Sequence, residues 1–100
     1  MVFGSDNLDV LVRTVSATPK EYISGLKQAV PGGIAVDGHE ITVRDGTVSI
    51  HIQIEILPDY VIALMRLPSL RATWTFQSGS DDERAECLNR IDWSMKRGGG

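Results

Sequence analysis

Glutamate, histidine and arginine side chains are the groups in this chain most able to do chemistry, and the sequence predicts that four of them share one row. Alternating polar and apolar residues over 33–77 place Glu40, His51, Arg66 and Arg71 side by side on neighbouring strands. Two arginines that stand opposite each other repel unless an anion lies between or beside them. An alternative hypothesis for the function is therefore that Arg66 and Arg71 bind a small anionic metabolite through paired hydrogen bonds, with His51 assisting.

The same row suggests an enzymatic hypothesis. An imidazole beside a carboxylate can act as a general base, so His51 paired with Glu40 could act on a substrate that the arginines hold. No nucleophile motif accompanies this pair. His39 is expected on the core side of its strand and His51 on the other side, so the two imidazoles diverge and no metal site or cofactor is predicted. The sequence therefore favours a protein without enzymatic activity, and we predict no catalytic residue.

Apolar residues on the same outward face predict a contact surface. Ile62 and Leu64 would be exposed in the middle of the sheet, next to the polar side chains of Gln53 and Thr73, with Tyr60 at one end of the same face. An apolar centre with a polar rim is typical of a protein interface. We therefore expect an interaction or regulatory module that forms a homodimer, or docks a protein partner, through its open sheet face. In the alternative interpretation this is an ordinary outer face with its arginines spread into solvent.

Two helices that must support this sheet are marked by capping signals. In the first, Thr18 is the N-cap, Pro19 the first helical residue and Glu21 the third; in the second, Ser80 and Glu83 form the same pattern. The apolar stripes expected to face the core comprise Tyr22, Ile23, Leu26, Ala29 and Val30 in the first helix and Leu88, Ile91 and Met95 in the second, with Cys87 at the margin.

Trp93 lies on the side of the second helix that is nearly opposite its apolar stripe. Two interpretations are open for it. The indole could cover a sheet edge or a loop, or it could be an exposed aromatic anchor for a partner. Cys87 is interpreted as a small buried hydrophobe rather than a nucleophile.

The sheet is predicted from one strand over 8–16 and an antiparallel meander of four or five segments. The first strand has apolar residues on both sides, which indicates burial on both faces or an interface on one. Turn signals divide the meander at Asp37-Gly38, Asp45-Gly46, Pro58-Asp59 and Pro68-Ser69. These turns pair Glu40 with His51, His51 with Arg66, and Arg66 with Arg71. The core face is then Ile34, Ile41, Val43, Val48, Ile50, Ile52, Ile54, Ile56, Val61, Ala63, Met65, Ala72, Trp74 and Phe76.

This order of elements predicts an α+β fold, β-α-β(4–5)-α, with two helices packed on one face of an antiparallel meander sheet. The order is similar to the TATA-binding-protein-like architecture, a resemblance of topology that implies a curved sheet with helices on one face. No motif of that family's DNA-binding surface is present in the sequence. A split βαβ sandwich is the alternative, since its sheet also leaves one face open.

Composition excludes several classes of function. The chain has 100 residues, of which 42% are hydrophobic and 23% charged, as expected for a single globular domain over 1–100 with flexible ends at 1–6 and 98–100. A net charge of −3 argues against nucleic-acid binding. The single cysteine favours a reducing, cytoplasmic location. No apolar run approaches the length that spans a bilayer, so no membrane association is expected.

Overall fold

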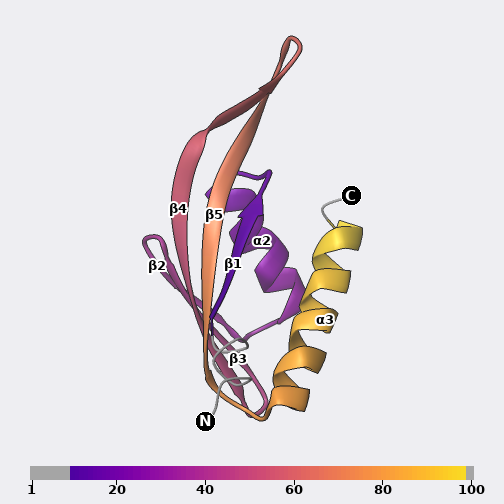
Figure 1. The fold of residues 1–100 in the computed structure, drawn as a ribbon. Helices are drawn as coiled ribbons and strands as arrows, with labels where there is room; N and C mark the ends of the chain where they lie inside the picture. Colours follow the sequence, from indigo (N-terminus) through magenta and orange to yellow (C-terminus); the bar gives the residue numbers. More distant parts are fainter. Residues whose placement is uncertain (1–9, 99–100) are drawn as a thin grey trace.

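The computed structural model describes residues 10–98 and has the predicted α+β architecture. Five strands form one antiparallel sheet in the order β1-β5-β4-β3-β2, and both helices pack on the same face (Figure 1). The elements are β1 (Val10–Val15), α2 (Pro19–Ala29), β2 (Ile34–Asp37), β3 (Glu40–Asp45), β4 (Val48–Ile62), β5 (Met65–Ser78) and α3 (Asp81–Gly98). This arrangement is compatible with the TATA-binding-protein-like topology expected from the sequence.

The two predicted capping boxes are confirmed. The Glu21 N–H donates to the Thr18 hydroxyl at 3.2 Å, and the Thr18 N–H donates back to the Glu21 carboxylate at 2.9 Å. At the start of α3 the Ser80 N–H donates to the Glu83 carboxylate at 2.8 Å, and the Glu83 N–H donates to the Ser80 hydroxyl at 3.2 Å. The first backbone N–H groups of each helix, which have no partner within the helix, are thus satisfied by side chains of the capping residues. Each helix therefore begins at the residue that the capping sequence predicts.

The helices and the sheet enclose one apolar core around Trp74, which is fully buried. Tyr22 and Leu26 cover it from α2, and Ile91 from α3. Cys87 lies inside this core rather than at its margin, and burial, followed by a hydrogen bond with Asp45, raises the pKa of its thiol to about 11. It is the small buried hydrophobe that the sequence predicted.

The first strand forms one edge of the sheet beside β5. Val10 and Val12 are exposed on the face without helices, whereas Leu11 and Val15 are half-buried beside the core. The predicted alternation is therefore confirmed over the described part of this strand. Its first two expected residues lie outside the described part of the chain, as do the expected flexible ends at 1–6 and 99–100. Gly98, expected in the flexible end, is instead the last residue of α3.

The β3–β4 hairpin turns one residue later than predicted. Asp45 pairs with Val48, so Ile41 lies opposite Ile52 rather than Ile50. Moving the turn by one residue changes the partner of each β3 residue by two residues along β4. Each side chain therefore stays on its predicted face, because side chains alternate with a period of two. Glu40 consequently lies opposite Gln53 instead of His51.

The two proline turns predicted for the meander are wrong. β4 runs through Pro58 without reversing and β5 runs through Pro68, and the chain turns between them at Ala63-Leu64. Pro58 and Asp59 together stand opposite Pro68 in a bulge between the Leu57 and Tyr60 pairs. Proline has no N–H to donate, so a bulge accommodates it where a regular ladder would lose a hydrogen bond. The single strand predicted over 60–67 is thus divided between the outer ends of β4 and β5.

This longer hairpin changes part of the predicted core face. Ile56, Val61 and Met65 are exposed, contrary to expectation, because they lie in the outer part of the hairpin beyond the helices. The exposed Ala63 occupies the turn with a φ of 53°. Leu70 joins the buried set instead. The remaining predicted residues do face the core: Ile34 partly buried, and Ile41, Val43, Val48, Ile50, Ile52, Ile54, Ala72, Trp74 and Phe76 buried.

We expect Gly33→Ala to destabilise the fold more than Gly32→Ala. A Cβ on Gly33 would lie 2.3 Å from the Arg44 carbonyl oxygen, and the Gly33 carbonyl accepts the Arg44 N–H at 2.8 Å, so backbone would have to move. Overpacking of this kind costs about 1–3 kcal/mol. Gly32 has a φ of +77° but open space around it, so its variant carries only the cost of that backbone conformation, about 1–2 kcal/mol. Urea unfolding of both variants measures the difference; equal losses would contradict the crowding argument.

The raised pKa of the Tyr22 hydroxyl predicts that the fold loses stability at alkaline pH. Burial raises the pKa of Tyr22 to about 12, against a hydrogen bond from the Trp74 indole that lowers it. The unfolded chain therefore loses this proton first, near its ordinary pKa of about 10. The contribution to stability is complete below about pH 10 and disappears as the pH rises toward 12. We expect urea unfolding to show roughly 2 kcal/mol more loss over this interval in the unsubstituted protein than in Tyr22→Phe. The same alkaline slope in both would refute the assignment.

Candidate functional site

The outer parts of β4 and β5 form an arm that only these two strands build. β3 makes its last pair with β4 at Gln53, and β1 makes its last pair with β5 at Leu70. Residues 56–69, the β4–β5 arm, therefore continue as a two-stranded ribbon, which projects beyond both helices (Figure 1). The molecule is elongated as a result, with extents of 47 × 30 × 25 Å.

Exposed apolar side chains gather on this arm. Of the ten large apolar residues exposed in the described part of the chain, six lie within it. Leu64 at the turn is fully exposed, and Tyr60 and Met65 are 59% and 60% exposed. A two-stranded ribbon alone is at best marginally stable in water. An apolar ribbon that the protein's own core does not cover is typical of a contact surface. The six residues are Ile56, Tyr60, Val61, Ile62, Leu64 and Met65.

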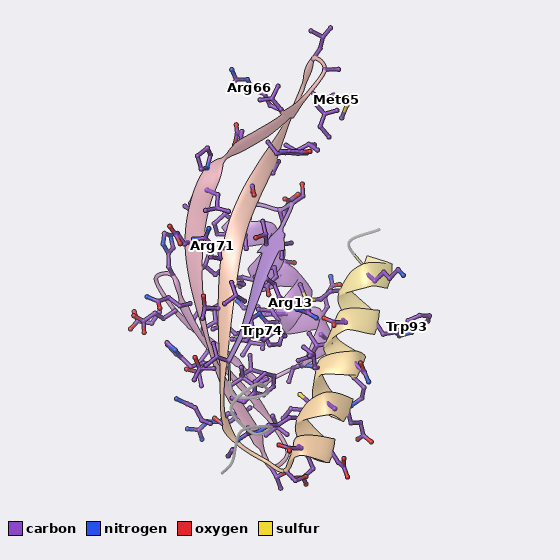
Figure 2. All side chains as sticks on the ribbon, viewed as in Figure 1. Arg13, Met65, Arg66, Arg71, Trp74 and Trp93 are labelled. Carbon is purple, nitrogen blue, oxygen red and sulfur yellow. The ribbon has the colours of Figure 1, made fainter. Side chains whose placement is uncertain are left out.

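The arm has two unlike faces. Tyr60 pairs with Leu67 and Ile62 with Met65, so these four side chains lie on one side. Together with Leu64 at the turn they form what we call the apolar arm face. Val61 pairs with Arg66 on the other side. Figure 2 shows Met65 and Arg66 leaving the arm in opposite directions, with Met65 on the side where α3 lies in that view.

The edges of the arm are poorly suited to pairing with another strand. Pro58 and Pro68 each lack an N–H, and the bulge between Leu57 and Tyr60 interrupts the ladder between them. Prolines and bulges at strand edges prevent the addition of further strands. Contacts with this arm would therefore be made by its side chains rather than by backbone hydrogen bonds.

A pocket of about 750 Å³ lies at the base of the arm, between α2, α3 and the end of β1. Its rim is joined to the arm by Ser16, whose hydroxyl donates to the Pro68 carbonyl at 3.2 Å. Lys20 and Lys96 line the pocket and form no ion pair with any other described residue. Its apolar lining comes from Val15, Ala17, Tyr22, Gly25 and Met95.

One wall of the pocket is a paired charge. The Arg13 guanidinium donates two hydrogen bonds to the Asp92 carboxylate, one of them 2.7 Å long, and so joins β1 to α3. This hydrogen bond is the main reason that the pKa of Arg13 is raised. The same guanidinium lies 5.6 Å from the centre of the Trp74 ring, and the Trp74 indole donates to the Tyr22 hydroxyl at 2.9 Å. The wall is therefore rigidly tied to the core and offers no free cation to a ligand.

The open sheet face does not contain the predicted row of four. His51 does contact Glu40, with 3.1 Å between the ring nitrogen and the carboxylate oxygen, although the two are diagonal rather than opposite. Arg71 lies opposite Glu55 and donates to it at 2.8 Å. Arg66 lies opposite Val61 on the arm. The predicted opposition of Arg66 and Arg71 is therefore wrong, because the hairpin that would have joined them does not exist.

The other predicted site residues are divided between two surfaces. Gln53 and Thr73 lie opposite each other on the open face, as expected for a polar surface. Ile62 and Leu64 are on the arm together with Tyr60, and not in the middle of the sheet as expected. Trp93 is 63% exposed and points away from the sheet (Figure 2), so the interpretation that it covers a sheet edge or loop is wrong. Its role as an anchor stays a prediction.

Sequence reasoning missed Leu67 and Met65 as partners of Tyr60 and Ile62. A usable signal was present in the positions of the two prolines. Pro58 and Pro68 are nearly equidistant from Ala63-Leu64, as they must be if both lie at the same level of one long hairpin. Proline at the first position of an ordinary turn favours types that splay hairpin strands, which argues against two separate reversals. The pocket had no such signal, because α3 closes it against β1 and α2 from a distant part of the sequence.

Other kinds of site find no support in residues 10–98. No group of three His, Cys, Asp or Glu side chains in this range is placed to hold a metal ion. No helix there has the length and apolar character needed to cross a bilayer. No protein-family model matches the sequence, and no curated protein matches it either. The candidate site is consequently defined by the geometry of this chain, as the β4–β5 arm and the pocket at its base.

Proposed function

We propose that this protein is a non-catalytic interaction module that binds a protein partner through the β4–β5 arm. The observation that carries the proposal is the concentration of exposed apolar side chains on residues 56–65. Full burial of a large apolar side chain contributes about 1.5–3 kcal/mol. Several half-exposed side chains buried together can therefore supply a substantial part of a binding free energy, provided that the arm is already formed before binding.

The arm replaces the open sheet face as the proposed contact surface. The apolar residues on which that expectation depended, Tyr60, Ile62 and Leu64, belong to the arm. The open face instead presents paired polar groups, with Glu55 bound to Arg71 and Glu40 to His51. Paired surface charges of this kind contribute little to binding. The face could still form the polar rim of a contact that is centred on the arm.

The alternative functions have no specific geometric support. Binding of an anion by Arg66 and Arg71 required the two guanidinium groups to lie together, and they are on different parts of β5 with Glu55 already bound to Arg71. General-base catalysis by His51 required a substrate held by those arginines. His51 and Glu40 remain in contact but lie on an open sheet face, away from the pocket.

The proposal predicts that a photoreactive benzoylphenylalanine at position 64 forms covalent adducts with a partner in extracts of the native host. Leu64 is fully exposed, so this substitution removes no packing within the fold. The matched control is the same residue at position 44, because Arg44 is exposed on the open face. Gel analysis after irradiation should show adducts from position 64 that are absent from position 44. Absence of adducts from 64, or an equal yield from both, would overturn the arm as the contact surface.

A further prediction concerns stability. Ile62→Lys should change the free energy of unfolding by less than about 0.5 kcal/mol, as expected for a surface site. Ile52→Lys should prevent folding, because Ile52 is fully buried and a lysine there would place an unpaired charge in the core. Circular dichroism and urea unfolding distinguish the two. A large loss of stability in Ile62→Lys would show that the arm is part of the core of the monomer.

A further inference from the structure

We propose that the pocket at the base of the arm binds a small organic anion. Lys20 and Lys96, which line the pocket, hold the charged group of this ligand, and the apolar part of the lining receives the rest of it. The site uses no residue of the β4–β5 arm, so the inference goes beyond the proposed function and does not depend on it. It also gives anion binding a different location from the one expected at Arg66 and Arg71.

Two helices each bring one lysine to the same pocket. Lys20 lies in the first turn of α2 and Lys96 in the last turn of α3, and both residues line the pocket. Both are exposed, and neither forms an ion pair with another residue in the described range 10–98. A lysine ammonium has three rotatable donors and forms charge-assisted hydrogen bonds with a carboxylate or phosphate. The pocket therefore offers two cations to one anion.

The two carboxylates of the lining already have hydrogen-bond donors. The Glu21 carboxylate accepts from the N–H and the hydroxyl of Thr18, at 2.9 and 3.2 Å. The Asp92 carboxylate accepts two hydrogen bonds from Arg13. With three basic and two acidic residues, the lining has one positive charge in excess, although the net charge of the whole chain is −3. A hollow with an excess of one charge concentrates ions of the opposite sign, so an anion suits this pocket better than a metal cation.

The apolar part of the lining includes the place where the two helices meet. Gly25 of α2 is so close to Met95 of α3 that a Cβ on the glycine would lie 3.2 Å from the methionine Cε. The glycine therefore lets this side chain lie directly against α2. The buried Tyr22 and the half-buried Val15 belong to the same lining. A methionine side chain is flexible and adapts to apolar groups of different shape. A ligand with an apolar part therefore gains more from this pocket than a bare inorganic anion does.

Uncharged polar side chains complete the lining. Ser24 and Gln28 are exposed residues of α2 that lie one turn apart, and therefore on one face of the helix. Their side chains form no hydrogen bond with any other described residue, so they can donate to and accept from a ligand. Small-molecule sites of roughly 300–1,000 Å³ combine apolar lining with a few polar groups. The pocket, with about 750 Å³, has the size and the mixed lining of such a site.

The test is a fluorescence titration with 8-anilinonaphthalene-1-sulfonate, which joins an anionic group to apolar rings. Its matched control is N-phenyl-1-naphthylamine, which has the same rings without the sulfonate. We expect the sulfonate to bind about tenfold more tightly than the uncharged probe, because only the sulfonate can pair with the two lysines. Equal affinity for the two probes, or no binding of the sulfonate, would overturn the proposal.

Lysine variants identify the groups that hold the sulfonate. Lys20→Met and Lys96→Met remove the charge and keep an apolar side chain, and each should weaken binding about threefold. Lys27→Met is the matched control, because Lys27 is exposed on α2 but does not line the pocket, and it should leave the affinity unchanged. The circular dichroism spectra of all three should match that of the unsubstituted protein. An equal loss of affinity in all three variants, or no loss in the first two, would overturn the assignment.

Amide chemical shifts locate the bound probe, because the exposed apolar side chains of the arm offer it a second surface. The largest changes should fall in residues 15–28 and 92–96, and Leu64→Asp should leave the affinity for the sulfonate unchanged. Changes confined to residues 56–69 would overturn the pocket as the binding site.

The anion site and the arm are tested independently. A pocket without affinity for the sulfonate, together with protein adducts from position 64, would overturn only the anion site. Affinity for the sulfonate in the pocket, without adducts from position 64, would overturn only the arm as the contact surface.

Discussion

The pairing of β4 with β5 is the constraint on which the rest of the structure depends. Near Trp74 this hairpin is the centre of the sheet, where both strands have neighbours and the helices cover their apolar side. Beyond Leu70 the same two strands continue with no neighbour and become the arm. A single uninterrupted hairpin therefore produces both the core and the proposed contact surface. A reversal at Pro58 would have returned the apolar residues of the arm to the sheet.

A small polar network holds the helices in register with this hairpin. Tyr22 on α2 accepts a hydrogen bond from the indole of Trp74, and Arg13 on β1 lies over the same ring while binding Asp92 on α3. A polar network at the boundary of the core specifies one arrangement when each of its groups has a partner. This network meets that condition, and it also forms the wall of the pocket, so the shape of the pocket is set by the packing of the core.

The arm differs from the rest of the fold in what stabilises it. Its strands have only each other, its edges carry Pro58 and Pro68, and its turn places Ala63 at a positive φ that glycine adopts more readily. The arm still exposes apolar surface, so burial by a partner would stabilise it more than it would stabilise a segment that is already packed in the core.

The sequence by itself determined the helices, the α+β class and the face of most strand residues, because capping at Thr18 and Ser80 and alternation along 41–54 are local properties. It also brought Glu40 to His51, since a short hairpin joins them. Only the tertiary structure decided where β4 ends and what surrounds Arg66 and Leu64. Proline is compatible with a turn or with a bulge, and the choice depends on strand pairing across the whole hairpin. The pocket likewise depends on three separate elements packing around Trp74, which no local pattern encodes.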